Sequence, residues 1–172
     1  MSKSIGLFYG TTTGKTESVA EMIRDEFGGD IVTLHEIGSI ENDDFAEYEC
    51  LIIACPTWNI GELQSDWEGF FSELDDIDFS GQKVAYVGTG DQDGYPDNFM
   101  DAMGILAEKI TKQGGETVGY WPVDGYDFNE SKAVVDGKFL GLAIDEDNQS
   151  DLTEARVKSW VSQLKTEFGI ED

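Results

Sequence analysis

Basic residues are scarce in this sequence. Of its 172 residues, 11 are lysine or arginine and 36 are aspartate or glutamate, which gives a formal net charge of −25 at pH 7. Unpaired carboxylates are too costly to bury, so most of this charge must lie on the surface. Such a surface repels nucleic acid and anionic membranes. We therefore expect no nucleic-acid partner, and we expect protein partners to present basic patches.

Cysteine, histidine and long apolar stretches are also rare. Cys50 and Cys55 are five positions apart on one apolar run, which places them on opposite faces of a strand and predicts buried thiols in a reducing compartment. The single histidine, His35, gives little support to a Ser-His-Asp triad. Without a signal-like or membrane-spanning stretch, we expect a cytoplasmic protein that does not insert into membranes.

Apolar runs alternate with helix-like patterns along the chain. Runs typical of buried strands occupy 5–9, 31–34, 50–55 and 84–87, and a fifth is divided between 117–121 and 139–144. The polar excursion between the two parts of the fifth run, 122–138, is either a partner surface or a structural flap.

Apolar residues at helical spacing follow Thr16, recur over 67–74, and continue behind Pro96, which suits an early helical position. A last helix is expected from Ser150 or Asp151, with Asp151 and Glu154 as a capping box. Strands alternating with helices predict an α/β fold, a doubly wound five-stranded parallel sheet with helices on both faces. Because no repeat or linker interrupts the chain, we expect one domain over 1–172.

Three loops follow the first, third and fourth of these strands, at 10–16, 56–62 and 88–95. In a parallel sheet they gather at the same edge, which is where open α/β sheets bind ligands. The first loop reads Gly-Thr-Thr-Thr-Gly-Lys-Thr and leads directly into a helix. A helix N-terminus presents unpaired N–H groups and partial positive charge, so this loop predicts a phosphate site.

Two common nucleotide motifs fit these loops poorly. Only three residues separate Gly10 from Gly14, whereas the P-loop requires G-x-x-x-x-G-K. The glycines of the third loop are spaced G-x-G-x-x-x-G rather than as in a dinucleotide fold. The first loop instead reads T-x-T-G-x-T, and Trp58 and Tyr95 lie on the other two loops. A phosphate cradle with two aromatic residues favours a phosphorylated planar ring, flavin mononucleotide (FMN).

The acidic stretch from Asp145 begins like a calcium-binding loop. However, Ser150 occupies the sixth position, where glycine is required, and Arg156 occupies the twelfth, where glutamate is required. We therefore expect no metal site in this stretch.

With these three loops and the interrupted fifth strand, the sequence resembles the flavodoxins, specifically the long-chain type, over essentially its whole length. The resemblance implies the strand order 2-1-3-4-5 with the last strand interrupted by a long loop. It also implies a monomer that binds FMN non-covalently and has no catalytic residues. Such a protein is a low-potential one-electron carrier that shuttles between the flavin semiquinone and hydroquinone. Implied partners are basic-surfaced redox proteins, such as ferredoxin–NADP reductase and photosystem I.

The same resemblance assigns residues to the cofactor. The FMN phosphate is expected in the loop 11–16, held by backbone N–H groups and threonine hydroxyls more than by Lys15. Trp58 and Tyr95 are expected on the two faces of the ring, and the Asn59–Ile60 peptide is expected to turn toward flavin N5. Because Ile60 is not glycine, that turn costs backbone strain. The full expected set is Thr11, Thr12, Thr13, Gly14, Lys15, Thr16, Thr57, Trp58, Asn59, Ile60, Gly61, Thr89, Gly90, Asp91, Tyr95, Asn98 and Asp147.

Acidic residues are concentrated beside two of these loops. Between 62 and 101 there are eleven acidic residues and one basic residue, Lys83. A like charge at about 7 Å, with an effective dielectric constant near 20, costs roughly 2 kcal/mol before screening. These carboxylates should therefore disfavour the anionic hydroquinone and steer basic partners to the site.

An enzyme on the same scaffold is the alternative. An FMN-dependent quinone or nitro reductase needs room for a substrate against the flavin ring. Two aromatic residues that cover both faces of the ring leave no such room, so the sequence favours an electron carrier over an enzyme.

Overall fold

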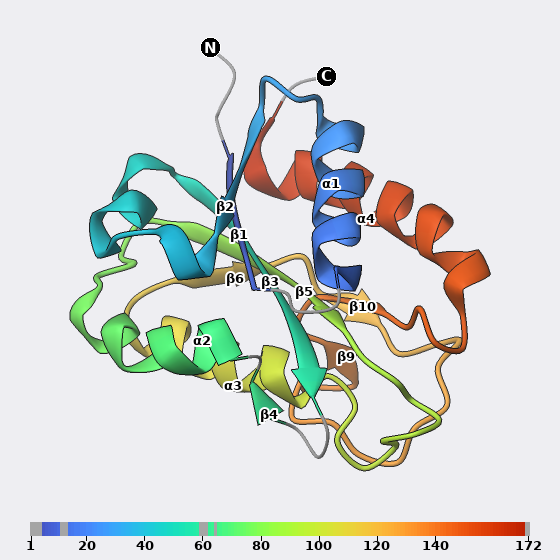
Figure 1. Ribbon diagram of the computed structural model, residues 1–172. Helices are drawn as coiled ribbons and strands as arrows, with labels where there is room; N and C mark the ends of the chain where they lie inside the picture. The colour runs from blue at the N-terminus through green and yellow to red at the C-terminus, as the bar shows by residue number, and fades with distance from the viewer. Residues whose placement is uncertain (1–4, 11–13, 59–61, 64, 171–172) are drawn as a thin grey trace.

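The structure, a computed structural model, describes residues 5–10, 14–58, 62, 63 and 65–170, with the backbone alone described for 58, 62, 63 and 65. Its centre is a sheet whose main strands follow the order β10-β5-β3-β1-β2, and neighbours along this path pair in parallel (Figure 1). These strands are β1 (Ile5–Tyr9), β2 (Val32–Glu36), β3 (Cys50–Trp58), β5 (Lys83–Thr89) and β10 (Leu142–Ile144). The short strand β4 (Glu62–Leu63) pairs antiparallel with β3.

The edge strand is divided, as the sequence predicted. Strand β6 (Glu116–Val118) pairs with 83–85 of β5, and β10 pairs with 87–89, both in parallel. The two parts together occupy the fifth position of the sheet, which confirms the order 2-1-3-4-5. Gly141 lies where the chain returns to the sheet, and a Cβ atom there would lie 2.0 Å from the carbonyl oxygen of Tyr86. Only glycine allows the chain to pass so close to β5 at this point.

Helices cover both faces of the sheet. Helices α1 (Lys15–Phe27) and α4 (Thr153–Phe168) lie on one face, and α2 (Ser65–Phe70) and α3 (Asp101–Lys112) lie on the other (Figure 1). Short 3₁₀ turns occupy Ile37–Ser39, Asn42–Glu47, Phe71–Asp76 and Ser150–Leu152. No helix of the described ranges is long and apolar enough to cross a membrane.

Each face of the sheet has its own apolar core. Trp67 is completely buried in the core under α2 and α3, and Trp160 is completely buried under α1 and α4. Cys55 belongs to the first core and Cys50 to the second, and both are buried thiols that form no disulfide. The prediction that the two cysteines lie on opposite faces is therefore confirmed, and burial raises the pKa of Cys55 to about 12.

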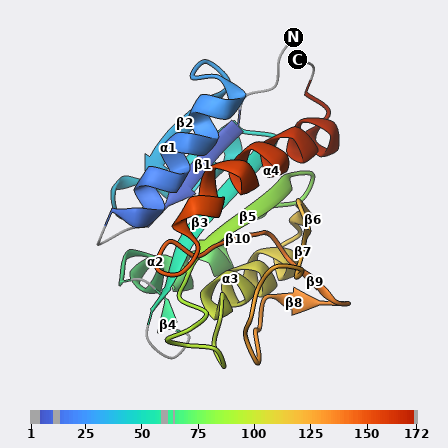
Figure 2. The same cartoon turned by 90° about the vertical axis from the view of Figure 1, so that its right-hand side faces the viewer.

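The excursion after β6 forms a small antiparallel sheet in the order β7-β9-β8. Its strands are β7 (Trp121–Pro122), β8 (Val134–Val135) and β9 (Lys138–Phe139), and they lie beside α3 (Figure 2). Phe139 is completely buried and packs with Phe99 and Phe128, at ring-centroid distances of 5.8 and 5.4 Å. This packing gives the excursion a structural role.

Two local predictions are wrong. The helix expected from Pro96 begins only at Asp101, because the carbonyl of Pro96 accepts the N–H groups of Asn129 and Glu130, at 2.8 and 3.0 Å, within a series of turns. The capping box expected at Asp151 is absent, since a 3₁₀ turn precedes α4 and its cap residue, Leu152, makes no side-chain cap hydrogen bond.

Candidate functional site

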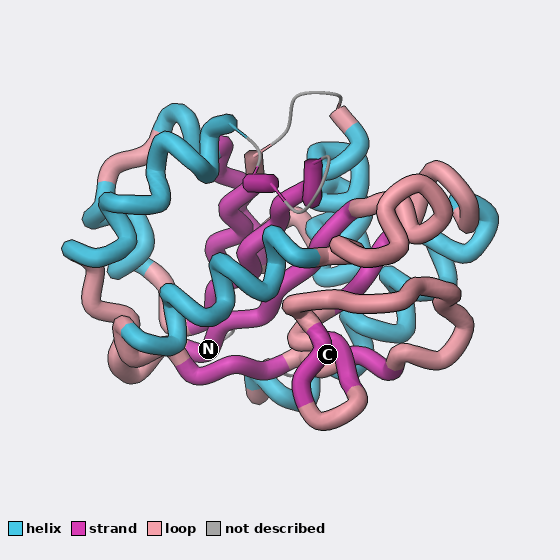
Figure 3. Tube along the Cα trace, turned by 90° about the horizontal axis from the view of Figure 1, so that it is seen from below, coloured by secondary structure: helices cyan, strands magenta, loops and turns pink. Residues whose placement is uncertain are grey.

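The carboxyl ends of the central parallel strands meet at one edge of the sheet. Hydrogen bonds continue from the strands into the first loop residues at this edge: Gly10 N–H donates to the carbonyl of Ala54 in β3 at 3.3 Å, and Gly90 N–H donates to that of Ile144 in β10 at 3.1 Å. Figure 3 views the molecule from below and shows loops gathered around this end of the sheet. The convergence of the described parts of these loops follows from the parallel topology, as the sequence predicted.

The start of α1 lies at this edge of the sheet, beside the ends of β5 and β10. Gly14 precedes the helix with a φ of 86°, and no side-chain hydrogen bond from the described residues caps this end. Thr16, in the first turn, is buried, and its hydroxyl lies 3.0 Å from the hydroxyl of Thr89. Two of the expected cofactor residues are thus in direct contact. Tyr9 donates to Glu17 at 3.0 Å, and burial and this bond raise the pKa of Tyr9 to about 12.

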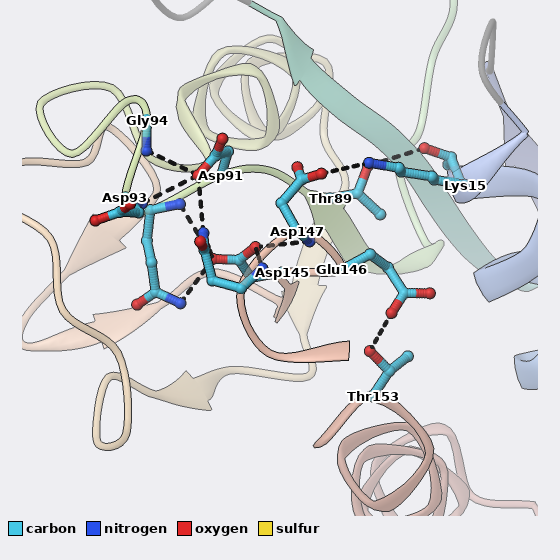
Figure 4. Close-up of polar contacts among 12 residues, drawn as sticks. Lys15, Thr89, Asp91, Asp93, Gly94, Asp145, Glu146, Asp147 and Thr153 are labelled. Carbon is cyan, nitrogen blue, oxygen red and sulfur yellow. Dashed lines mark hydrogen bonds and ion pairs between the residues drawn. The ribbon is translucent and has the colours of Figure 1, made fainter. Parts of the chain in front are cut away.

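Lys15 and Asp147 form an ion pair across the site, with Nζ and Oδ1 2.5 Å apart (Figure 4). The hydrogen bond to Asp147 raises the pKa of Lys15 above its usual value. Both side chains are nearly half exposed. Because the ammonium group is engaged by this carboxylate, the pair supports the expectation that Lys15 is a minor contributor to phosphate binding.

Asp145 is the buried anchor of the edge (Figure 4). Its carboxylate accepts the backbone N–H and side-chain Nε2 of Gln92, at 3.1 and 2.7 Å. It also accepts the backbone N–H groups of Asp147 and Asn148, at 3.1 and 3.0 Å, and the Nδ2 of Asn148 at 2.9 Å. A charged acceptor with this many donors fixes the loop after β10 against the loop after β5.

Asp91 continues this network toward the surface. Its Oδ1 accepts the N–H groups of Gly94 at 2.8 Å and Asp93 at 3.1 Å, and the Nδ2 of Asn148 at 2.8 Å. The bond from Gly94 is the largest of several causes that lower the pKa of Asp91. Carboxylate oxygens of Asp91, Asp145 and Asp147 lie within 4.8 Å of one another. Because N–H donors or Lys15 already contact these groups, the cluster is a hydrogen-bonded loop support.

Of the remaining expected cofactor residues, the structure describes some and not others. Tyr95 is 39% exposed at this edge. Thr57 accepts the N–H of Ala102 at 3.1 Å, and Asn98 donates to Asp101 at 3.1 Å, so both side chains contact the start of α3. Thr11, Thr12, Thr13, Asn59, Ile60 and Gly61 lie outside the described residues, as does the side chain of Trp58.

Sequence reasoning missed the role of Asp145 and Gln92. The signal that was available is the order Asp-Glu-Asp-Asn directly after a buried strand, since Asp and Asn at such a position commonly accept backbone N–H groups two and three residues ahead. Gln92 gave no signal, because its partner lies 53 positions away in the chain.

Fold and site together define an open α/β protein. At the ligand edge of its sheet, the start of α1 is suited to bind a phosphate, and the surrounding rim is acidic and hydrogen-bonded. The sequence matches the flavodoxin family over residues 7–160, and the chain belongs to this family. The flavodoxin of Nostoc sp. strain PCC 7120 is 72% identical over 170 residues, which is 99% of this chain and 100% of the relative. The flavodoxin of Synechocystis sp. strain PCC 6803 is 67% identical over 162 residues, or 94% and 95% of the two chains.

Solved structures agree with the fold. The Fusobacterium nucleatum flavodoxin bound to flavin mononucleotide superposes with a TM-score of 0.91 at 33% identity, covering 96% of this chain and 98% of the other. A mutant of that flavodoxin, also bound to flavin mononucleotide, gives a TM-score of 0.92 at 34% identity, covering 97% and 98%.

Proposed function

We propose that this chain is a low-potential one-electron carrier that binds FMN non-covalently at the carboxyl edge of its sheet. The observation that carries the proposal is the contact of the start of α1 with the end of β5 and with the loop after β10, made by Thr16 with Thr89 and by Lys15 with Asp147. Membership of the flavodoxin family and the FMN-bound structures of F. nucleatum flavodoxin support the same cofactor.

The described residues suit FMN at this edge. The N-terminus of α1, without a side-chain cap from the described residues, is suited to a phosphate dianion, and the exposed ring of Tyr95 is suited to cover a planar group. FMN supplies one-electron redox chemistry when it is bound. The phosphate would be held by 11–16 and the ring by Trp58 and Tyr95. The remaining contacts would come from Thr57, Asn59, Ile60, Gly61, Thr89, Gly90, Asp91, Asn98 and Asp147.

We expect negative charge at the rim to lower the redox potential of FMN bound there. Hydrogen bonds that lower the pKa of Asp91 keep its carboxylate ionised at neutral pH. Asp147 is partly neutralised by Lys15, whereas buried Asp145 stays within a cage of N–H donors. Fixed negative charge close to a bound group disfavours the arrival of further negative charge there. We therefore infer a low potential for the more reducing of the two one-electron steps.

We further propose that the chain acts as a single-domain monomer in the cytoplasm and exchanges electrons with basic-surfaced proteins, including ferredoxin–NADP reductase and photosystem I. The net charge of −25 supports this choice, because opposite charge accelerates encounter between proteins. The high identity to flavodoxins of Nostoc and Synechocystis supports it as well.

A redox titration of the FMN-reconstituted protein, followed by visible absorption, tests the electron-carrier function. We expect two separated one-electron steps, and a single two-electron step would contradict the proposal. Turnover of a quinone or nitro compound by reduced nicotinamide, with no reductase present, would favour the enzyme instead. Electron transfer from ferredoxin–NADP reductase, measured by stopped flow, should slow as ionic strength rises, because salt screens the attraction.

A further inference from the structure

A cavity of about 330 Å³ lies between helix α3 and the β8–β9 hairpin, away from the residues assigned to FMN. The two elements that form it lie side by side in Figure 2. Its volume falls within the usual range of small-molecule pockets, about 300–1,000 Å³. None of its lining residues takes part in the hydrogen bonds of the candidate FMN site.

The interior of the cavity is apolar. Gly104 and Ala107 of α3 line one side, and Val135 and Leu140 of the hairpin segment line the other. Val135 is 44% exposed, so part of the apolar lining is uncovered. A Cβ atom at Gly104 would lie 2.4 Å from the carbonyl oxygen of Lys132, so the two elements are in backbone contact at this point.

The lining carries an excess of positive charge. Lys112 lies 3.3 Å from Glu108, but both side chains are at least 70% exposed, so the pair holds Lys112 only weakly. Lys132 makes no ion pair within the described part of the chain and is exposed. Lys138 lies opposite Val135 in the register of the hairpin. In a chain with 11 basic and 36 acidic residues, this local balance is the reverse of the whole.

We propose that this cavity binds a small amphipathic anion, an apolar chain or ring that carries one carboxylate. The apolar part lies against Ala107, Val135 and Leu140, where it covers surface that is now exposed to water. The carboxylate lies at the opening, within reach of the Lys132 and Lys112 ammonium groups. Thr111 lines the same cavity beside these lysines.

The chemistry of the cavity excludes other classes of small ligand. A cation is repelled by the two lysines, and a neutral apolar compound makes no use of them. A polyanion is repelled by the net charge of −25 in proportion to its own charge, whereas a single carboxylate is repelled least and meets Lys112 and Lys132 at this cavity. A single carboxylate on an apolar body matches both the lining and the opening.

Titration of the FMN-loaded protein with octanoate, followed by two-dimensional ¹H–¹⁵N NMR, tests the proposal. We expect saturable shifts at the amides of Ala107, Thr111 and Val135, with the flavin absorption spectrum unchanged. Octylammonium, which has the same chain and the opposite charge, should produce at least several-fold weaker binding. Shifts scattered over the surface, or equal binding of the two compounds, would overturn the proposal.

Two variants test separately what the positive charge and the apolar contact contribute to octanoate binding. Lys132→Gln and Val135→Ser change exposed side chains and should each weaken octanoate binding by about threefold or more. Lys158→Gln is the control for net charge, since Lys158 is an exposed lysine of α4, on the other face of the sheet from the cavity. An equal loss in Lys158→Gln and Lys132→Gln would show that only net charge matters, and the site would be refuted.

Discussion

Lys15 and Asp147 lie 132 positions apart in the chain, and their side chains form an ion pair of 2.5 Å. The pair joins the start of α1 to the loop after β10, at the edge where the FMN contacts are proposed. Because both side chains are nearly half exposed, solvent screens the pair and limits its contribution to stability. The ion pair therefore matters mainly because it places charge near the proposed FMN site.

Replacing Asp147 with asparagine should raise the potential of the more reducing one-electron step. The change removes a negative charge and leaves the Lys15 ammonium group without its partner. Coulomb attraction toward an added electron then increases, and we expect a positive shift of some tens of millivolts. Redox titration measures it. Asp78→Asn is the control, since Asp78 is fully exposed and lies in another part of the fold. A shift of the same size in both variants would refute the local effect.

Thr16→Val should weaken FMN binding far more than Lys15→Ala. Valine keeps the shape of the side chain but removes a buried hydroxyl that lies 3.0 Å from the hydroxyl of Thr89, in the first turn of the helix that starts at the proposed phosphate site. We expect a loss of about tenfold, corresponding to about 1.4 kcal/mol, for Thr16→Val and less than about threefold for Lys15→Ala. Quenching of flavin fluorescence gives both dissociation constants. Equal losses would mean that the ammonium group binds the phosphate directly.

Asp145→Asn should destabilise the protein by about 1–3 kcal/mol, because the new amide NH₂ faces N–H donors and leaves buried groups unpaired. Urea unfolding of the apo and FMN-bound forms measures the change. Asp151→Asn alters an exposed carboxylate in the same part of the chain and should stay within about 0.5 kcal/mol of the parent. If Asp145→Asn and Asp151→Asn changed the free energy of unfolding equally, the network around Asp145 would contribute nothing to stability.

The stabilisation contributed by Asp91 should disappear in acid. Hydrogen bonds led by that from Gly94 lower its folded-state pKa below the unfolded value. A lowered pKa means that the contribution is complete above the unfolded pKa, about 3.9, and is lost as pH falls through the folded-state value. The difference in unfolding free energy between the parent and Asp91→Asn should therefore be constant from pH 7 to about pH 5 and shrink below about pH 4. A difference that grew in acid would contradict the assignment.

The sequence predicted those features that local pattern controls. Continuous apolar runs identified β1, β3 and β5, and the odd spacing of Cys50 and Cys55 placed them in separate cores. The start of α3 was misplaced because the turns before it depend on partners from the distant excursion. The N–H groups of Asn129 and Glu130 bind Pro96, and no local pattern signals such bonds.

The candidate site was predictable to a similar extent. The apolar spacing after Thr16 located α1, and strand order brought its start to the ends of β5 and β10, where Thr16 meets Thr89 and Lys15 meets Asp147. The network on Asp145 was not predictable, because it depends on which distant donors the fold brings to one buried carboxylate. Composition marked the acidity of this edge but could not show which carboxylates are anchored by N–H groups.

The division of the edge strand at Tyr86 lets the sheet accept the excursion as an insertion. Strands β6 and β10 pair with positions of β5 on either side of this residue, so the hydrogen-bond ladder resumes after the chain has left the sheet and returned. Segments of different length can therefore be inserted at this point without shifting the register of the strands that position the loops. The sheet can therefore carry a folded excursion beside α3, with a cavity of its own, and still hold the strands of the cofactor edge in one register.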